Sequence, residues 1–245
     1  MRMRMLAGLA AFTILAGAGG ALAGSKRIDL VPALADPSRP EADRARDADR
    51  KPAELIAFSG LRKGDKVAEL APGRGYFTRL LGAAVGPKGR VYALAANPHA
   101  DVIAIAAANP NVSAVTAPPG TVPVPAPVDI VWTTLNYHDF KNVKVGESDG
   151  AAAVNAAAFR ALKPGGIYFI VDHQTAAGAG ASQTSTLHRI EDAIVKREVE
   201  AAGFRLEAES PLLRHAGDDH SQRVQETGIR GKTDQFVLRF RKPKR

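Results

Sequence analysis

The sequence predicts an α/β fold built on a mostly parallel sheet with helices on both faces. Short apolar segments alternate with Ala-rich or amphipathic segments along most of the chain. The apolar segments are nearly continuous, which is typical of strands buried on both faces. A Gly-rich turn at residues 70–76 also joins the first of these segments directly to a helical pattern.

Seven segments are predicted strands. The first five are apolar and are expected to form the parallel part of the sheet. The last two alternate apolar and polar residues, so they are expected to pair with each other and add an antiparallel C-terminal strand. In chain order, the expected strands cover residues 66–70, 90–94, 112–115, 128–134, 167–171, 204–209 and 235–240.

Helices are expected between these strands and before the first of them. Pro52 suits the first turn of a helix, where its missing N–H costs nothing, and Gly203 suits the position just after a helix end. Residues 117–127 are rich in proline and predict a loop in place of a crossover helix. The expected helices cover residues 41–50, 52–59, 76–85, 98–108, 151–162 and 187–202.

The first 23 residues resemble a secretory signal. Arg2 and Arg4 precede an uncharged apolar segment at residues 6–20, and Ala21-Leu22-Ala23 supplies the small residues that a signal peptidase reads. We expect cleavage after Ala23 and export to the periplasm, with no membrane span in the mature chain. The alternative is an uncleaved membrane anchor, since such an anchor differs mainly in length.

Two further units are expected, an N-terminal helical extension at residues 24–60 and the sheet domain at residues 61–245. The formal net charge of +8 is spread along the chain, and the few aromatic residues do not alternate with basic ones. A nucleic-acid partner is therefore not expected. The absence of cysteine excludes disulfides, thiol catalysis and Cys-based zinc sites.

The turn between the first strand and its helix is the sharpest local signal. Gly73 and Gly75 lack a Cβ, so their backbone N–H groups can approach a ligand closely at a helix N-terminus. A Gly-x-Gly pattern by itself is equally compatible with a tight turn that binds nothing. Its position at the carboxyl end of a strand favours the ligand-binding interpretation.

Several of these segments resemble the motifs of class I S-adenosylmethionine-dependent methyltransferases, which have a Rossmann-like fold. The resemblance covers roughly residues 60–241, with Ala71 where the first glycine of the family motif stands. It is carried by residues 64–76 (GDKVAELAPGRGY), 86–93 (GPKGRVYA), 127–131 (PVDIV), 162–166 (LKPGG) and 202–204 (AGF).

A closer resemblance is to a group of predicted bacterial methyltransferases, many of which carry export signals. Its signature blocks are residues 72–76 (PGRGY), 136–139 (NYHD), 172–173 (DH), 187–190 (LHRI) and 231–236 (GKTDQF). The resemblance implies S-adenosyl-L-methionine as cofactor. It also implies a set of cofactor-binding residues, namely Glu69, Ala71, Gly73, Gly75, Tyr76, Asn97 and Asn136.

One position departs from the family pattern. The second strand of class I methyltransferases usually ends in an acid that binds the ribose hydroxyls, whereas residues 91–97 (VYALAAN) contain none. Asn97 can exchange hydrogen bonds with a diol, although neutral hydrogen bonds are weaker than those of a carboxylate.

Polar side chains follow two expected strands that should be neighbours. His138 and Asp139 come after the fourth strand, and Asp172 and His173 end the fifth. The carboxyl ends of parallel strands meet at one edge, so we expect these four residues to form the catalytic group. Either imidazole could serve as a base for an oxygen or nitrogen nucleophile, with an aspartate orienting it. The structural alternative is that Asp172 and Asn136 cap turns against which the histidines pack.

The same four side chains could instead bind a divalent ion, as in catechol-type methyltransferases. Their Asp-His order differs from the Asp-Asn pair of that group, so no metal site is assigned. His188 and Arg189 are expected to begin a helix near the crevice, where they either contact the substrate or form a solvated pair.

The leading hypothesis is methyl transfer to an oxygen or nitrogen of a small molecule or envelope component. The alternative is a non-catalytic exported protein that retains the fold and binds a ligand, which agrees with the missing ribose acid. A nicotinamide-dependent oxidoreductase ranks third, because position 78 is Thr where the Gly-x-Gly-x-x-Gly fingerprint needs glycine.

Overall fold

The computed structural model describes residues 28–244. The expected signal segment, residues 1–23, lies outside the described residues. Within residues 28–244, no helix is both long enough and apolar enough to cross a membrane.

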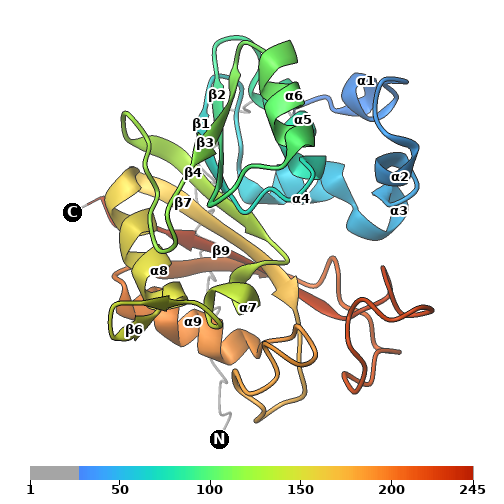
Figure 1. The fold of residues 1–245 in the computed structure, drawn as a ribbon, viewed down its shortest axis with the longest axis vertical. Helices are drawn as coiled ribbons and strands as arrows, with labels where there is room; N and C mark the ends of the chain where they lie inside the picture. The colour runs from blue at the N-terminus through green and yellow to red at the C-terminus, as the bar shows by residue number, and fades with distance from the viewer. Residues whose placement is uncertain (1–27, 245) are drawn as a thin grey trace, which may run out of the picture.

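A seven-stranded sheet forms the centre of the fold (Figure 1). Its strands lie in the order β3-β2-β1-β4-β7-β9-β8, and all neighbouring pairs are parallel except the two that β9 forms with β7 and β8. This confirms the predicted Rossmann-like, mostly parallel sheet with an antiparallel C-terminal strand. The strands are β1 (Lys66–Leu70), β2 (Arg90–Ala95), β3 (Val112–Thr116), β4 (Val128–Thr134), β7 (Leu162–His173), β8 (Arg205–Ser210) and β9 (Gln235–Arg241).

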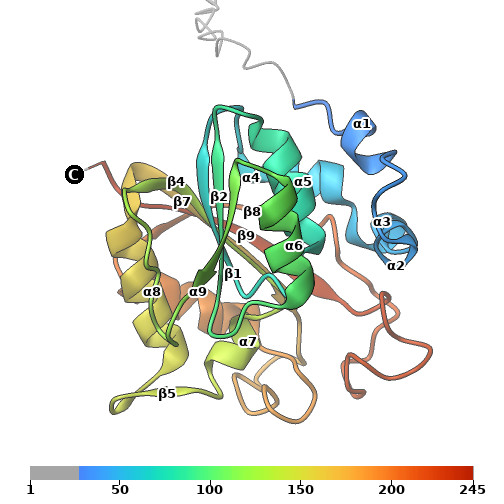
Figure 2. The same cartoon turned by 45° about the horizontal axis from the view of Figure 1, so that its top comes forward.

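Helices cover both faces of the sheet, each over its own hydrophobic core (Figures 1 and 2). One face carries α4 (Pro52–Ser59), α5 (Tyr76–Val85) and α6 (Ala100–Ala108), and the other carries α8 (Gly150–Ala161) and α9 (Asp192–Ala201). In the first core, the rings of Trp132 and Phe169 lie 4.3 Å apart between centroids, and both side chains are fully buried. The apolar runs of β1, β4 and β7 thus supply both cores at once.

The order of the strands reverses beside β1. The chain moves outward from β1 through β2 to β3, and then returns to place β4 on the other side of β1. Ligands of such sheets bind beyond the carboxyl ends of the strands at this reversal. The proline-rich stretch 117–127 crosses from β3 to β4 without a helix, as predicted.

The helix expected at residues 187–202 is shorter than predicted, because α9 begins only at Asp192. The preceding residues form a loop, and Ile190 pairs with Gln174 as an isolated bridge. Arg189 explains the difference: its side chain is fully buried and bonded to Asp218. His188 and Arg189 therefore do not begin a helix, which corrects that expectation.

Other local elements also differ from the predictions. The expected helix at residues 41–50 is two single turns, and β7 begins at Leu162, five residues before the strand expected at residues 167–171. Elements not predicted are two short helices and a small hairpin. The unpredicted elements are α1 (Val31–Leu34), α7 (Tyr137–Phe140), β5 (Lys144–Val145) and β6 (Ser148–Asp149), and the two turns within residues 41–50 are α2 (Glu41–Arg44) and α3 (Asp47–Arg50).

Candidate functional site

The turn after β1 adopts the left-handed backbone conformation at three positions. Ala71, Gly73 and Gly75 have φ values of 49°, 57° and 82°. A Cβ on Gly75 would lie 2.4 Å from Ile105 Cδ1, so this glycine lets α6 pack against the turn. A Cβ on Gly73 would meet nothing within 4 Å. The backbone at Gly73 therefore faces open space that a ligand can enter.

Ala71 is strained in this conformation because it carries a Cβ. We expect Ala71→Gly to raise the free energy of unfolding by about 1 kcal/mol. The matched control is Ala83→Gly at an exposed position of α5, which should lower it by about 1 kcal/mol. Denaturant unfolding measures both changes. A loss of stability in Ala71→Gly would contradict the assigned backbone conformation.

A cavity of about 260 Å³ lies beyond the carboxyl ends of β1 and β2. Most of its lining is apolar, and Asp139 contributes a carboxylate at one side. Such a lining suits a flat, weakly polar group. The lining residues come from the end of β1 (Leu70, Ala71), the end of β2 (Leu94, Ala95, Ala96), the proline-rich loop (residues 117–121), the α7 region (Asp139, Phe140, Val143) and α8 (Gly150, Val154).

Glu69 does not line this cavity. Its side chain is buried on the opposite face of β1, where Thr78 Oγ1 donates a hydrogen bond of 2.6 Å to its carboxylate. Burial raises the pKa of Glu69 to about 7, although the Thr78 hydrogen bond and the charge of Arg50 both favour the ionised form.

Tyr76 connects the helix after the turn to the N-terminal extension. Its hydroxyl donates a hydrogen bond of 2.7 Å to Asp47, whose two carboxylate oxygens also accept hydrogen bonds of 2.7 Å from Arg39. Arg79 of α5 forms a further ion pair with Asp43 at 3.0 Å. The extension is thus fixed against the start of α5, at the edge of the candidate site.

Three guanidinium groups gather where the extension meets the loop before β9. Burial, together with the nearby charges of Arg46 and Arg230, lowers the pKa of Arg50 to about 10. Among the described residues, none of the three forms a salt bridge, and the buried Nε of Arg50 has no hydrogen-bond partner. Unpaired like charges held together in this way favour an anionic ligand. We call Arg46, Arg50 and Arg230 the arginine cluster.

His138 is held by Asp172 across the ends of β4 and β7. Asp172 is fully buried, and its carboxylate accepts hydrogen bonds of 2.7 Å from the backbone N–H groups of His138 and His173. The same carboxylate lies 2.8 Å from Nδ1 of His138. Burial lowers the pKa of His138, but the charge and hydrogen bond of Asp172 outweigh it, so the net shift is upward. Because Nδ1 of His138 faces Asp172, Nε2 points away from that carboxylate.

The side chain of His173 does not join the contact between His138 and Asp172. Burial lowers the pKa of His173 to about 3, so its imidazole is neutral in the folded protein. Its Nδ1 lies 2.8 Å from the hydroxyl of Thr233. The His173 ring centroid is 6.2 Å from that of His138.

His188 takes the position beside His138 that His173 was expected to occupy. Its Nδ1 lies 3.2 Å from His138 Nε2 and 3.4 Å from Asp139 Oδ1, and its Nε2 lies 3.0 Å from Arg223. His188 has a φ of 56°, which is strained for a residue with a Cβ. The loop before α9 therefore adds His188 to the group formed by His138 and Asp139 after β4 and Asp172 in β7.

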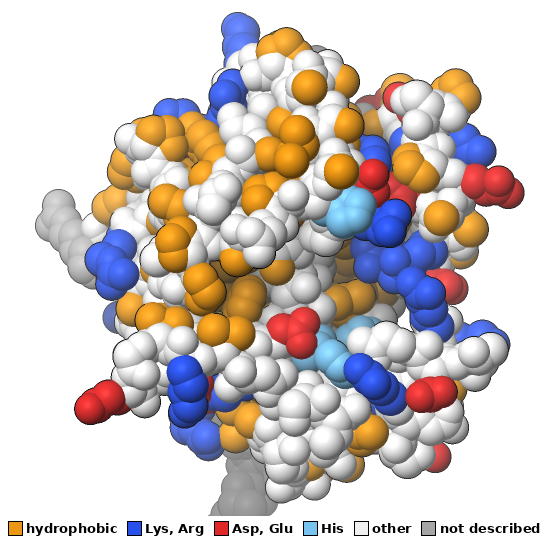
Figure 3. Space-filling view, in the orientation of Figure 1, with side chains coloured by type: hydrophobic (Ala, Val, Ile, Leu, Met, Phe, Trp, Pro, Cys, Tyr) orange, Lys and Arg blue, Asp and Glu red, His pale blue; other side chains and the backbone are white. Residues whose placement is uncertain are grey.

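Asn136 and Leu135 shape the same edge. The side-chain amide of Asn136 donates hydrogen bonds to the carbonyls of Ala71 at 3.0 Å and Thr134 at 2.6 Å, which joins the ends of β1 and β4. Leu135 also has a positive φ of 60°. Strained residues thus surround the crevice, as is typical of functional sites. Figure 3 shows this face with Lys and Arg side chains on one side of a hollow and His and acidic side chains on another.

Several solved structures with the same fold are S-adenosylmethionine-dependent methyltransferases, and another is the [4+2]-cyclase SpnF, with a TM-score of 0.57 and 17% identity over 80% of this chain and 81% of that one. An S-adenosylmethionine-dependent methyltransferase from Aquifex aeolicus matches with a TM-score of 0.59 and 18% identity, over 82% of this chain and 95% of that one. Aeropyrum pernix fibrillarin in complex with natively bound S-adenosyl-L-methionine matches with a TM-score of 0.51 and 16% identity, over 80% and 76% of the two chains.

A third similar structure is the 1,6-didemethyltoxoflavin-N1-methyltransferase of Burkholderia thailandensis with bound 1,6-didemethyltoxoflavin and S-adenosylhomocysteine. It has a TM-score of 0.52 and 18% identity, over 83% of this chain and 79% of that one. The chain has the class I methyltransferase fold. No protein-family model and no curated protein sequence matches it.

Within this methyltransferase fold, the predicted cofactor residues divide into four groups. Ala71 lines the cavity and Gly73 faces open space, whereas Gly75 and Asn136 shape the turn. Glu69 and Tyr76 face α5 and the extension rather than the cavity. Asn97 is exposed and is not among the lining residues, and β2 ends in Ala95 without an acid.

The four predicted catalytic residues are only partly brought together. His138, Asp139 and Asp172 are joined by direct contacts, while His173 lies apart against Thr233. Arg46, Arg50 and Arg230 were not predicted, because the first two fall in a charged run typical of an exposed helix. Arg189 is buried against Asp218 and has no free guanidinium to offer a substrate.

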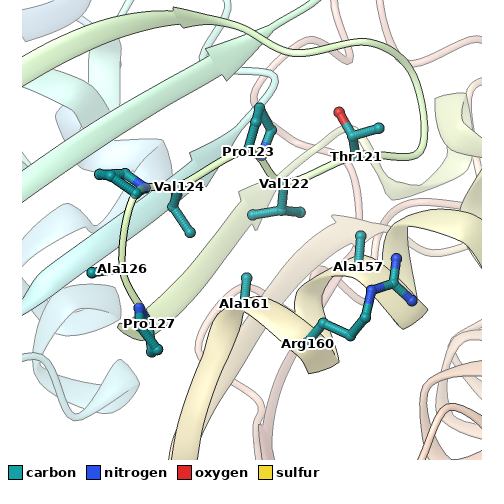
Figure 4. Close-up of a pocket in the computed structure, with 10 residues that line it drawn as sticks. Thr121, Val122, Pro123, Val124, Ala126, Pro127, Ala157, Arg160 and Ala161 are labelled. Carbon is teal, nitrogen blue, oxygen red and sulfur yellow. The ribbon is translucent and has the colours of Figure 1, made fainter.

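A second hollow of about 390 Å³ lies between the proline-rich loop and the end of α8 (Figure 4). Among the described residues that line it, Arg160 alone carries a titratable group. The hollow lies beside Pro127, where β4 begins, whereas His138 and Asp172 lie at the carboxyl ends of β4 and β7. Because its described lining has no group suited to catalysis, a substitution in this hollow is a suitable control.

Proposed function

We propose that this chain transfers the methyl group of S-adenosyl-L-methionine to an oxygen or nitrogen atom of a small or envelope-associated molecule. The observation that carries the proposal is the apolar cavity of about 260 Å³ that opens beside Ala71 at the reversal of strand order. In open α/β sheets this is the position where nucleotide ligands bind. The solved structures with the same fold include one with bound S-adenosyl-L-methionine and one with bound S-adenosylhomocysteine.

The residues present fit the parts of this cofactor. The apolar walls around Leu94 and Pro118 suit an adenine ring, and the open backbone at Gly73 leaves space for the rest of the nucleoside. The unpaired arginine cluster suits the carboxylate of the methionine part, because guanidinium groups bind carboxylates through paired hydrogen bonds. When bound, the cofactor supplies an electrophilic methyl group on a sulfonium.

The acceptor side is the group formed by His138, Asp139 and His188. Methyl transfer is an in-line displacement, so the main task of the protein is to position the attacking atom. Asp139 lines the cavity and also lies 3.3 Å from His138 Nε2, which connects the two halves of the site. Asp172 acts as a positioning residue, since it holds the backbone and the ring of His138.

Filling the cavity should weaken cofactor binding. Ala96 is exposed at the cavity mouth, so Ala96→Phe should lower the affinity for S-adenosylhomocysteine by about tenfold or more without disturbing the core. Ala126→Phe makes the same change in the hollow of Figure 4 and should leave the affinity unchanged. Isothermal titration of the full chain measures both. No heat at millimolar ligand with the unaltered chain would contradict the proposal.

The arginine cluster should contribute a charge-assisted contact. Arg50→Met keeps much of the length of the side chain and removes its charge, and it should weaken S-adenosylhomocysteine binding by about tenfold, as expected for the loss of one hydrogen bond to a charged group. Arg44→Met lies on the same extension at an exposed position and is the matched control. Equal affinities of the two variants for S-adenosylhomocysteine would show that the methionine part of the ligand does not contact the arginine cluster.

A non-catalytic role has one specific observation in its favour, the end of β2. Ala95 and Ala96 stand where an acid would bind the ribose hydroxyls. A ligand-binding protein that retains the methyltransferase fold would bind a different compound, and mass spectrometry of material released from the purified chain would identify it. A released adenosyl nucleoside would support the enzyme instead.

We also propose that the chain is exported and belongs with the often exported bacterial group whose signature blocks it resembles. The support is the charged, apolar and small-residue layout of residues 1–23. Fractionation of cells expressing the full chain should recover a shortened form in the periplasm that begins at Gly24. Recovery of the full-length form in the cytoplasm would contradict this proposal.

A further inference from the structure

Three potential metal-ligand atoms converge at the edge of the cavity. They are Nε2 of His138, Oδ1 of Asp139 and Nδ1 of His188. The three pairwise separations are 3.2 Å between the two imidazole nitrogens, 3.3 Å from His138 to Asp139 and 3.4 Å from His188 to Asp139. The three atoms thus form a nearly equilateral triangle. A single shared proton can join one pair of these atoms at a time, whereas a cation contacts all three.

The size of the triangle matches a tetrahedral ion of the zinc class. Nitrogen and oxygen ligands lie about 2.0–2.1 Å from zinc, so the corners of its tetrahedron are about 3.3–3.4 Å apart. Adjacent oxygen ligands of octahedral magnesium are closer, at about 2.9 Å, and magnesium prefers oxygen to imidazole. We propose that His138, Asp139 and His188 bind one divalent transition-metal ion of the zinc class.

The surroundings of His138 support this assignment. Nδ1 of His138 faces the fully buried carboxylate of Asp172 at 2.8 Å, so the proton lies on Nδ1 and the lone pair on Nε2 points at the triangle. Histidine ligands of metals usually donate their other N–H to a carboxylate in this way. The one-turn helix α7 places His138 and Asp139 side by side, and the strained backbone of His188 turns its ring toward them.

The fourth corner of the tetrahedron has no described protein ligand. Zinc sites with three protein ligands and an open position are typically catalytic, whereas structural sites have four. The open corner can take an oxygen or nitrogen atom of the acceptor near Asp139, and this last point alone rests on the proposed methyl transfer. Metal binding itself does not depend on the cofactor, so the two proposals are tested separately.

Arg223 predicts a further property of the site. Its guanidinium lies 3.0 Å from Nε2 of His188, but coordination through Nδ1 leaves a proton on Nε2. The exposed Arg223 side chain must therefore move away when the ion binds. Arg223→Met should therefore bind the ion at least as tightly as the unaltered chain.

The test is titration of the tag-free full chain with Zn²⁺ and with Co²⁺ after treatment with a chelator. We expect one ion per chain and the strong visible absorption of tetrahedral Co²⁺. Asp139→Asn and His188→Gln alter partly exposed residues and should each weaken binding by about tenfold or more. His215→Gln changes an exposed imidazole outside the triangle and is the matched control.

Asp172→Asn tests the positioning role separately and should weaken binding by about 10–100-fold. The inference is overturned if the unaltered chain binds neither ion, if Co²⁺ gives only the weak spectrum of an octahedral complex, or if Asp139→Asn and His188→Gln bind like the control. Because these titrations contain no cofactor, their failure leaves the cavity experiments unaffected.

Discussion

Arg189→Met should lower the free energy of unfolding by about 3–5 kcal/mol, because it leaves a buried carboxylate without its partner. Arg189 is fully buried, and its guanidinium donates hydrogen bonds of 2.7 and 3.0 Å to the two oxygens of Asp218. It donates further hydrogen bonds of 3.0 Å to the carbonyls of Gln174 and Gln222. Denaturant unfolding measures the loss.

The control for this prediction is Arg205→Met on the exposed side of β8, where the change should be within about 0.5 kcal/mol. Arg189 connects the end of β7 to the loop before β9, which also carries Arg230. Its loss should therefore weaken ligand binding as well as folding. A change of less than about 1 kcal/mol would show that Asp218 is satisfied without Arg189.

Glu69→Gln should stabilise the protein at alkaline pH and not at acidic pH. Burial raises the pKa of Glu69 from 4.5 to about 7, so the folded state favours the protonated carboxyl. The folded chain therefore holds a proton that the unfolded chain releases between pH 4.5 and 7. The stability due to this group is complete below pH 4.5 and is lost as the pH rises to about 7.

At pH 8 the ionised, buried carboxylate costs about 3 kcal/mol, which glutamine avoids while its carbonyl still accepts the Thr78 hydrogen bond. The difference in unfolding free energy between Glu69→Gln and the unaltered chain should thus grow from near zero at pH 4.5 to about 3 kcal/mol at pH 8. Other groups titrate in both proteins and cancel in this difference. A difference that does not change with pH would contradict the buried, protonated state.

Much of the fold was predictable because the strands are buried on both faces. The predicted bounds of β1, β4 and α5 agree with the structure, since their apolar runs, with glycines flanking β1 and α5 and Pro127 before β4, leave little alternative. The helix at residues 187–202 was predicted too long because its apolar spacing continues through Ile190. Tertiary contacts determine where this helix begins, because the buried ion pair between Arg189 and Asp218 requires residues 187–191 to form a loop.

The candidate site was predicted less completely than the fold. Parallel strand ends brought His138 and Asp172 together as expected, because sheet topology alone requires it. His188 was expected near the crevice but at the start of a helix, and its contact with His138 depends on a loop that folds back over the sheet. The arginine cluster also depends on loops and was not predicted. A charged run such as residues 41–50 has no pattern that distinguishes a solvated helix from one that carries Arg50 to a site.

The most direct test of the central claim is a crystal structure of the chain soaked with S-adenosylhomocysteine. We expect the adenine between Leu94 and Pro118, the nucleoside beside the backbone of Gly73, and the carboxylate within hydrogen-bond distance of Arg50. Density for the ligand in the hollow of Figure 4, or its absence from the cavity at saturating concentration, would contradict the account.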